Sequence, residues 1–217
     1  MQPPSSRLRR RLLVSAAGAL LPGVLGTSRA ADAPVLLVVG DSISAGYGLG
    51  NGEGWVNLLS ARIREQGLPY RVVNASISGD TTAGGRARLP QLLKQHKPAI
   101  VIIELGGNDA LRGGDLAATR ANLDAMVQAA QAAGARVVLV GMQLPPNYGS
   151  GYVRAFGALF ADVAKARNVP VVPFVFEGFA DDLAQFQPDR IHPTASAQPR
   201  ILANVWPALA PLLGRRG

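Results

Sequence analysis

The sequence of 217 residues contains no cysteine. This absence excludes a disulfide framework, a cysteine nucleophile and any zinc site built on thiolates. Histidine is nearly as scarce, because only His96 and His192 occur, so chemistry that needs an imidazole has two candidates. Charged residues make up 17% and hydrophobic residues 48% of the chain. This composition can bury a core and is not that of a disordered protein.

The positive charge of the chain is concentrated at its N-terminus. The formal net charge is +8, and residues 1–30 contain five arginines but neither aspartate nor glutamate. Removing these five leaves +3 for the remainder, which is ordinary for a small domain. No basic stretch with interleaved aromatic residues follows, so the sequence predicts no nucleic-acid partner.

Residues 1–31 have the organisation of a secretory signal peptide. A basic region ends at Arg11, an apolar stretch covers residues 12–25, and small residues follow. The apolar stretch is short for a membrane span and is interrupted by proline and glycine. We therefore predict that the signal is removed and that residues 32–217 form a single periplasmic or secreted domain. A twin-arginine signal and a retained membrane anchor are the alternatives.

Short apolar runs alternate with segments of helical periodicity in the rest of the chain. The runs are rich in consecutive valine, isoleucine and leucine, which is typical of parallel strands buried on both faces. The predicted strands cover residues 35–39, 70–74, 100–104, 137–140 and 169–174. The predicted helices cover residues 55–66, 116–133, 152–167 and 195–213. This alternation predicts an α/β fold, a three-layer α/β/α sandwich with a five-stranded parallel sheet.

Polar and glycine-rich turns follow the first three predicted strands, at residues 40–44, 74–80 and 106–109. In parallel α/β sheets, ligands bind beyond the carboxyl ends of the strands. We therefore expect these three turns to meet at one edge of the sheet and to form the functional site.

Ser42 lies in the first of these turns, where a tight strand-to-helix connection can expose its hydroxyl. A serine hydroxyl needs a general base to act as a nucleophile. His192 is the candidate base, because Asp189 can fix one ring nitrogen while the other faces the serine. A loop histidine bonded to a local aspartate is the alternative interpretation of that pair. His96 lies in a charged segment before the third strand and is predicted to be a surface residue.

Gly79 and Asn108 lie in the other two turns and can supply electrophilic assistance. A tetrahedral intermediate carries an oxyanion that requires fixed hydrogen-bond donors. We expect the backbone N–H groups of Ser42 and Gly79 and the side-chain amide of Asn108 to provide them. Asn108 alone also fits a structural role as a turn residue after two glycines.

Four motifs occur together in the order Gly40-Asp41-Ser42-Ile43, Gly79, Gly106 with Asn108-Asp109, and Asp189 with His192. In order and position they resemble the GDSL-type, or SGNH, hydrolase family. Ile43 stands where the family usually has leucine, and both are apolar packing residues. Further stretches are similar to a periplasmic multifunctional thioesterase/lysophospholipase/arylesterase subgroup, at residues 74–81, 106–113, 146–149 and 189–193.

The resemblance implies a flavodoxin-like SGNH hydrolase fold with a catalytic triad of Ser42, Asp189 and His192. The implied activity is hydrolysis of carboxylic esters and thioesters through an acyl-enzyme on Ser42. It requires no metal and no organic cofactor. The expected partners are small-molecule or lipid esters, with transient contact to membrane lipids and a monomeric chain.

The resemblance also assigns roles around the triad. Asp41 and Asp109 are expected to brace the active-site turns rather than to act chemically. Residues 111–115 correspond to a mobile loop that covers acyl chains, and a pair of glycines within them makes such motion reasonable. Leu111 and Pro146 are expected to contact the substrate.

Other functions fit the sequence less well. The glycine-rich residues 46–54 do not contain G-x-G-x-x-G, and no serine lies in G-x-S-x-G, which argues against a dinucleotide site and an α/β-hydrolase. A carbohydrate acetyl-esterase of the same fold is the alternative enzyme. A non-catalytic binding protein would be expected to lack a triad or oxyanion residue. The apolar residues at 144–146 and 174–179 favour an acyl-chain site.

Overall fold

A five-stranded parallel sheet forms the centre of the computed structural model, which describes Met1 and residues 33–214. The strand order is β2-β1-β3-β4-β5. The strands are Val35–Gly40 (β1), Arg71–Asn74 (β2), Ile100–Glu104 (β3), Arg136–Val140 (β4) and Val171–Val172 (β5). Apart from Met1, the predicted signal peptide lies outside the described residues.

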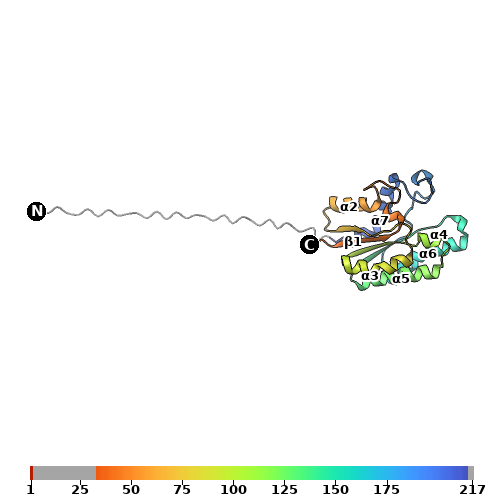
Figure 1. The fold of residues 1–217 in the computed structure, drawn as a ribbon, viewed down its shortest axis with the longest axis horizontal. Coiled ribbons are helices and arrows are strands. Elements are labelled where there is room, and N and C mark those ends of the chain that lie inside the picture. The colour runs from red at the N-terminus through yellow and green to blue at the C-terminus, as the bar shows by residue number, and fades with distance from the viewer. Residues whose placement is uncertain (2–32, 215–217) are drawn as a thin grey trace.

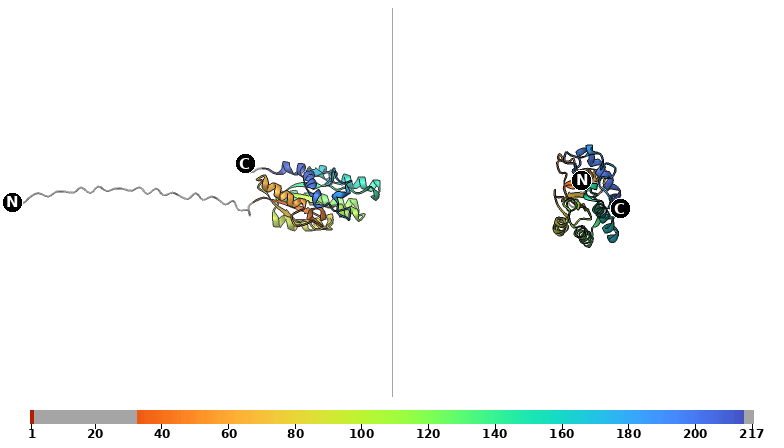
Figure 2. Two further views of the ribbon diagram at one scale, coloured as in Figure 1. Left: turned by 90° about the horizontal axis from the view of Figure 1, so that it is seen from above. Right: turned by 90° about the vertical axis from the view of Figure 1, so that its right-hand side faces the viewer.

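Helices cover both faces of the sheet, which confirms the predicted three-layer α/β/α sandwich (Figure 1). One face is covered by α2 and α7, and the other by α3, α5 and α6. The right-hand view of Figure 2 also shows helices on both sides of the sheet. The main helices are Trp55–Glu65 (α2), Thr82–His96 (α3), Leu116–Ala132 (α5), Ser150–Arg167 (α6) and Gln198–Leu209 (α7). Two short helices at the carboxyl edge are Ser42–Ala45 (α1) and Gly107–Leu111 (α4). In the described residues, no helix has the length and apolar character needed to cross a membrane.

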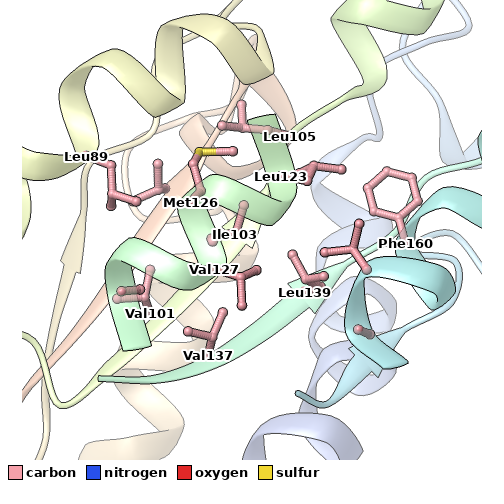
Figure 3. Close-up of a cluster of buried hydrophobic side chains, with 14 of the residues drawn as sticks. Leu89, Val101, Ile103, Leu105, Leu123, Met126, Val127, Val137, Leu139 and Phe160 are labelled. Carbon is pink, nitrogen blue, oxygen red and sulfur yellow. The ribbon is translucent and has the colours of Figure 1, made fainter. Parts of the chain in front are cut away.

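The apolar strands are buried on both faces because successive side chains point to opposite sides. On β1, Leu37 belongs to the cluster beneath α3, α5 and α6, whereas Leu36 belongs to the cluster beneath α2 and α7. Both residues have no exposed surface. The close-up of the first cluster shows Leu123 and Val127 of α5 among side chains from the sheet and from α6 (Figure 3).

The strand order reverses direction between β1 and β3, which pair in parallel with Gly40 opposite Glu104. In a doubly wound sheet, the crevice at this reversal is the usual ligand site. The turns that follow β1 and β3 therefore open into the same crevice. Ser42 lies two residues after the end of β1 and Asn108 four residues after the end of β3, so the topology brings both to one edge.

The fifth strand is shorter than predicted. Residues 169–174 are predicted to be extended, but only Val171–Val172 pair with β4. Pro170 and Pro173 flank this pair, and neither has an N–H to donate to a ladder. The last predicted helix, 195–213, is also interrupted: α7 lies between 3-10 turns at Ala195–Ala197 and Ala210–Leu212.

Helix α3 is absent from the sequence-based prediction. Its sequence contains Gly84, Gly85 and Pro90, which lower intrinsic helix propensity. Tertiary packing overrides this propensity. The helix packs so closely on Leu105 that a Cβ added to Gly85 would lie 2.3 Å from the Leu105 Cδ1. Gly85, which weakens the local helix signal, is therefore a residue that lets α3 approach Leu105 just after the end of β3.

Phe160 supports the turn after β3 from below. Its ring packs edge-to-face on Phe156 with centroids 5.4 Å apart. A Cβ added to Gly106 would lie 3.3 Å from the Phe160 Cζ. We predict that Phe160→Ala lowers the free energy of unfolding by about 3–5 kcal/mol, because it leaves a cavity in a closely packed core. Urea unfolding measures this loss. Phe160→Leu is the matched control and should lose less, and an equal loss in both variants would contradict this packing role.

Candidate active site

The turn after β1 holds Ser42 at the start of α1. Asp41 caps this helix, because its Oδ1 accepts a hydrogen bond from the Ile43 N–H at 3.0 Å. Gly40 precedes the turn, and a Cβ there would lie 2.8 Å from the Glu104 Oε2. Only glycine leaves room for that buried carboxyl. Ser42 is thereby fixed in the wall of a cavity with 9% of its surface exposed.

His192 and Asp189 continue a line of hydrogen bonds from Ser42. The His192 Nε2 lies 2.9 Å from the Ser42 Oγ, and its Nδ1 lies 2.7 Å from the Asp189 Oδ2. The Asp189 Oδ1 accepts the backbone N–H groups of Ile191 at 2.9 Å and of His192 at 3.0 Å. A proton on Nδ1 therefore leaves Nε2 to accept from the serine hydroxyl.

Tyr47 was not anticipated from the sequence. Its ring packs against the His192 ring with centroids 4.5 Å apart. Gln187 joins the two loops that carry these rings, because its side-chain amide donates to the Tyr47 carbonyl at 2.8 Å and to the Pro193 carbonyl at 3.1 Å. The signal in the sequence is an aromatic residue among flexible glycines, five residues after Ser42. Its partner is visible only in three dimensions.

Gly79 and Asn108 lie on the side of the site formed by the turns after β2 and β3. Gly79 has φ 80°, a left-handed conformation that favours glycine. In residues 33–214, the backbone N–H groups of Ser42 and Gly79 donate to no acceptor. The Asn108 Nδ2 donates to the Asp41 Oδ2 at 3.1 Å and to the Asp80 carbonyl at 2.9 Å. Both amide hydrogens of Asn108 are thus engaged when no substrate is bound.

A cavity of about 460 Å³ opens beside Ser42 and His192. Leu111 and Pro146, the two predicted substrate contacts, both line it, and so does Asn108. Gly79 is not among the lining residues. The remaining wall is mainly apolar and includes Met142, Leu144, Phe174, Phe176, Phe186 and Ile191. The cavity therefore suits an apolar group placed next to the serine hydroxyl.

Two carboxyl groups are buried beneath the turn that carries Ser42. Burial raises the pKa of Asp41 from 3.8 to about 6, against hydrogen bonds from the Ile43 N–H and the Asn108 amide that lower it. Burial, followed by repulsion from Asp41, holds the pKa of Glu104 well above its usual value. The Ser44 hydroxyl donates to the Glu104 Oε2 at 2.7 Å. The two carboxyls therefore brace this turn at an electrostatic cost.

The Asp189 carboxyl shows the opposite behaviour. Partial burial alone would raise its pKa, but hydrogen bonds from the His192 backbone and ring and from the Ile191 N–H outweigh it. The pKa of Asp189 is lowered to about 2. Asp189 therefore stays ionised at neutral pH and can stabilise a positive charge on the imidazole of His192.

The other residues singled out from the sequence lie outside this line of hydrogen bonds. His96 is the last residue of α3, is partly buried, and does not line the cavity. Asp109 accepts from the Thr82 N–H at 2.9 Å and from the Thr82 hydroxyl at 2.5 Å, which joins α4 to the start of α3. In the described part of the chain, no group of three or more His, Asp or Glu side chains could hold a metal ion.

A serine, a histidine and an aspartate in hydrogen-bond contact at the carboxyl edge of a parallel sheet have the arrangement found in serine hydrolases. The comparison with known families is specific: the profile of the GDSL-like Lipase/Acylhydrolase family matches residues 38–198, well over half of the chain. The chain belongs to this family. The matched residues begin within β1 and end at the start of α7, so they contain the whole site.

Relatives of known name are similar over nearly their full length. The chain is 55% identical to Esterase TesA of Pseudomonas aeruginosa, over 94% of this chain and all of that protein. It is 45% identical to Thioesterase 1/protease 1/lysophospholipase L1 of Escherichia coli, over 88% of this chain and 90% of that protein. A crystal structure of TesA, 56% identical, superposes with a TM-score of 0.81 over 82% of this chain and 99% of the other.

The buried Asp41 predicts a pH dependence of stability. Its pKa is about 6 in the folded protein, above the ordinary 3.8. The folded state therefore binds more protons than the unfolded state between these values, and stability falls as pH rises from about 4 to 6. We predict that Asp41→Asn reduces this fall by about 1–3 kcal/mol. Urea unfolding at several pH values measures it, and an unchanged slope in the variant would argue against a buried, titrating Asp41.

Proposed function

We propose that the protein hydrolyses carboxylic esters and thioesters through an acyl-enzyme on Ser42. The hydrogen-bonded line from the Ser42 Oγ through the His192 ring to Asp189 carries this proposal. His192 accepts the serine proton through Nε2 while the oxygen attacks the acyl carbonyl, and it then protonates the leaving alcohol or thiol. Water subsequently attacks the acyl-enzyme, with the same imidazole as general base.

The oxyanion of the tetrahedral intermediate is proposed to lie between three donors. The N–H groups of Ser42 and Gly79 are suited to this role because they donate to no acceptor in residues 33–214. The Asn108 amide is suited by its place on the cavity wall. Its two hydrogens donate to Asp41 and Asp80. When the oxyanion forms, one of these two hydrogen bonds must therefore be shared with the oxyanion or released.

An acyl chain is the proposed occupant of the cavity. The lining is mainly apolar, and Leu111 and Pro146 lie in its wall as proposed substrate contacts. The names of the relatives, which include esterase, thioesterase, lysophospholipase and arylesterase, agree with a broad range of acyl substrates. We propose that the substrates are esters of lipids, whose acyl chain would contact the apolar wall while the ester carbonyl lies at Ser42. We also propose that the protein makes transient contact with membrane lipids.

Export is part of the same proposal. We propose that residues 1–31 direct the chain out of the cytoplasm and that residues 32–217 act there as one monomeric domain. The basic, apolar and small-residue segments of the N-terminus support this assignment. N-terminal sequencing of the protein from a periplasmic fraction tests it, because an intact N-terminus there would contradict removal of the signal.

The two histidines provide a matched test of the proposed mechanism. Ser42→Ala and His192→Ala should each lower kcat on a short p-nitrophenyl ester by at least about 10³-fold, since both act in the same proton transfer. His96→Ala should retain wild-type turnover because His96 does not line the cavity. Steady-state kinetics measures all three variants. Wild-type turnover in Ser42→Ala would rule out this serine as the nucleophile.

Acyl-chain length separates the proposed function from its alternative. With p-nitrophenyl esters of two to sixteen carbons, we predict that kcat/KM rises beyond acetyl, because each buried methylene adds about 0.8 kcal/mol of transfer free energy. Replacing Leu111 with Asp should reduce kcat/KM for long chains more than for acetyl. A sharp optimum at acetyl, with no activity on longer chains, would instead support a carbohydrate acetyl-esterase.

A further inference from the structure

Arg88 lies on α3, outside the cavity wall, yet its guanidinium reaches the turns that carry the site. Its side chain is 19% exposed and that of Asp80 is 11% exposed. The Nε donates to the Asp80 Oδ2 at 2.8 Å, and one terminal nitrogen donates to the Gly40 carbonyl at 3.3 Å. The other terminal nitrogen donates to the Ala75 carbonyl. A single planar group thus holds the last residue of β1, the first residue after β2 and the carboxylate that precedes α3.

The fit around Asp80 shows that this contact is built into the fold. A Cβ added to Gly84 would lie 2.0 Å from the Asp80 Oδ1, so only glycine allows the carboxylate to lie against the first turn of α3. The same oxygen accepts the Thr81 N–H at 2.9 Å. Gly84 and Arg88 are four residues apart and therefore lie on one face of the helix. The helix therefore provides both the space for the Asp80 carboxylate, at Gly84, and the guanidinium of Arg88 that binds it.

The contacts of Arg88 close a ring that passes through the proposed oxyanion donors. Gly40 is bonded covalently to Asp41, which accepts from the Asn108 amide. That amide also donates to the Asp80 carbonyl, and the Asp80 carboxylate returns to Arg88. Gly79 is the residue immediately before Asp80. The ring joins the turns after β1, β2 and β3, and Arg88 is its only member on a long helix.

We propose that Arg88 is a positioning residue for catalysis, which fixes the Asp80 carbonyl and thereby aims the Asn108 amide at the oxyanion. This inference rests on the proposed function. Arginine suits the task better than lysine, because its rigid fork can donate to three acceptors at once. A misplaced donor affects the transition state more than the bound substrate, so loss of Arg88 should lower kcat and leave KM nearly unchanged.

Arg86 offers a matched control on the same helix. It is exposed and donates to the Asn122 side chain at 3.1 Å. Arg88→Met should lower kcat on a short p-nitrophenyl ester by about 10- to 100-fold with KM within about twofold, which is less than the loss of an entire oxyanion donor. Arg86→Met should stay within about twofold of the wild type. Arg88→Lys should fall between these two, and it takes the place of Arg88→Met if that variant does not fold.

A double-variant cycle with Asn108→Ala tests whether Arg88 acts through the amide. In the Asn108→Ala background, replacing Arg88 should change kcat by less than about threefold, because its target is already missing. The inference is overturned if Arg88→Met turns over like Arg86→Met, if only KM changes, or if the full loss persists without Asn108. Ser42→Ala separates failure of the proposed function from failure of this inference. If Ser42→Ala is active, the proposed function fails. If Ser42→Ala is inactive and Arg88→Met is unaffected, only the inference about Arg88 fails.

Discussion

The geometry of the site depends on two hydrogen bonds that the Asp41 carboxylate accepts. One oxygen caps the short helix that starts with Ser42, and the other accepts the Asn108 amide. These two bonds join the turn of Ser42, the proposed nucleophile, to a proposed oxyanion donor, although Asp41 and Asn108 are 67 positions apart in the sequence. The carboxylate can do so because the strand order reverses between β1 and β3, so that both turns emerge at the same crevice. The position of the serine and that of the amide are therefore set together.

This arrangement has an electrostatic cost. Asp41 and Glu104 are both buried, and burial disfavours the charged form of each. Each carboxyl group accepts a hydrogen bond from the turn that carries Ser42, Asp41 from the Ile43 N–H and Glu104 from the Ser44 hydroxyl. Around them, the apolar strands supply the burial that stabilises the domain. Both buried carboxyl groups lie at the edge of the sheet that carries the candidate site, and the strand residues beneath them are apolar.

Much of the fold could be predicted from the sequence because its strands are strongly apolar. The third strand was predicted at residues 100–104, where β3 lies, and the order of strands and helices gave the correct layers. The prediction missed α3, since its glycines and proline have low helix propensity and are accommodated by contacts with Leu105 and Asp80. It overextended β5, where two prolines end the ladder.

The candidate site was predictable to the extent that it follows strand ends. Ser42 and Asn108 lie in short helices that follow β1 and β3, Gly79 lies in the turn after β2, and His192 was one of two histidines. The partners of these residues were not predictable, because they depend on three-dimensional contacts between distant segments. Tyr47 packs on a ring 145 positions away, and Arg88 reaches the carbonyl of Gly40 from a helix that the sequence did not indicate.

Covalent labelling of Ser42, the proposed nucleophile, tests the central claim most directly. An organophosphonate ester that reacts with activated serines should add one phosphonyl group per chain, which intact-mass spectrometry detects. Peptide mapping should place that group on Ser42, and the loss of esterase activity should follow the labelled fraction. Modification of a different residue, such as Ser44 or Ser78, with loss of activity, or full activity in protein labelled on Ser42, would contradict the account.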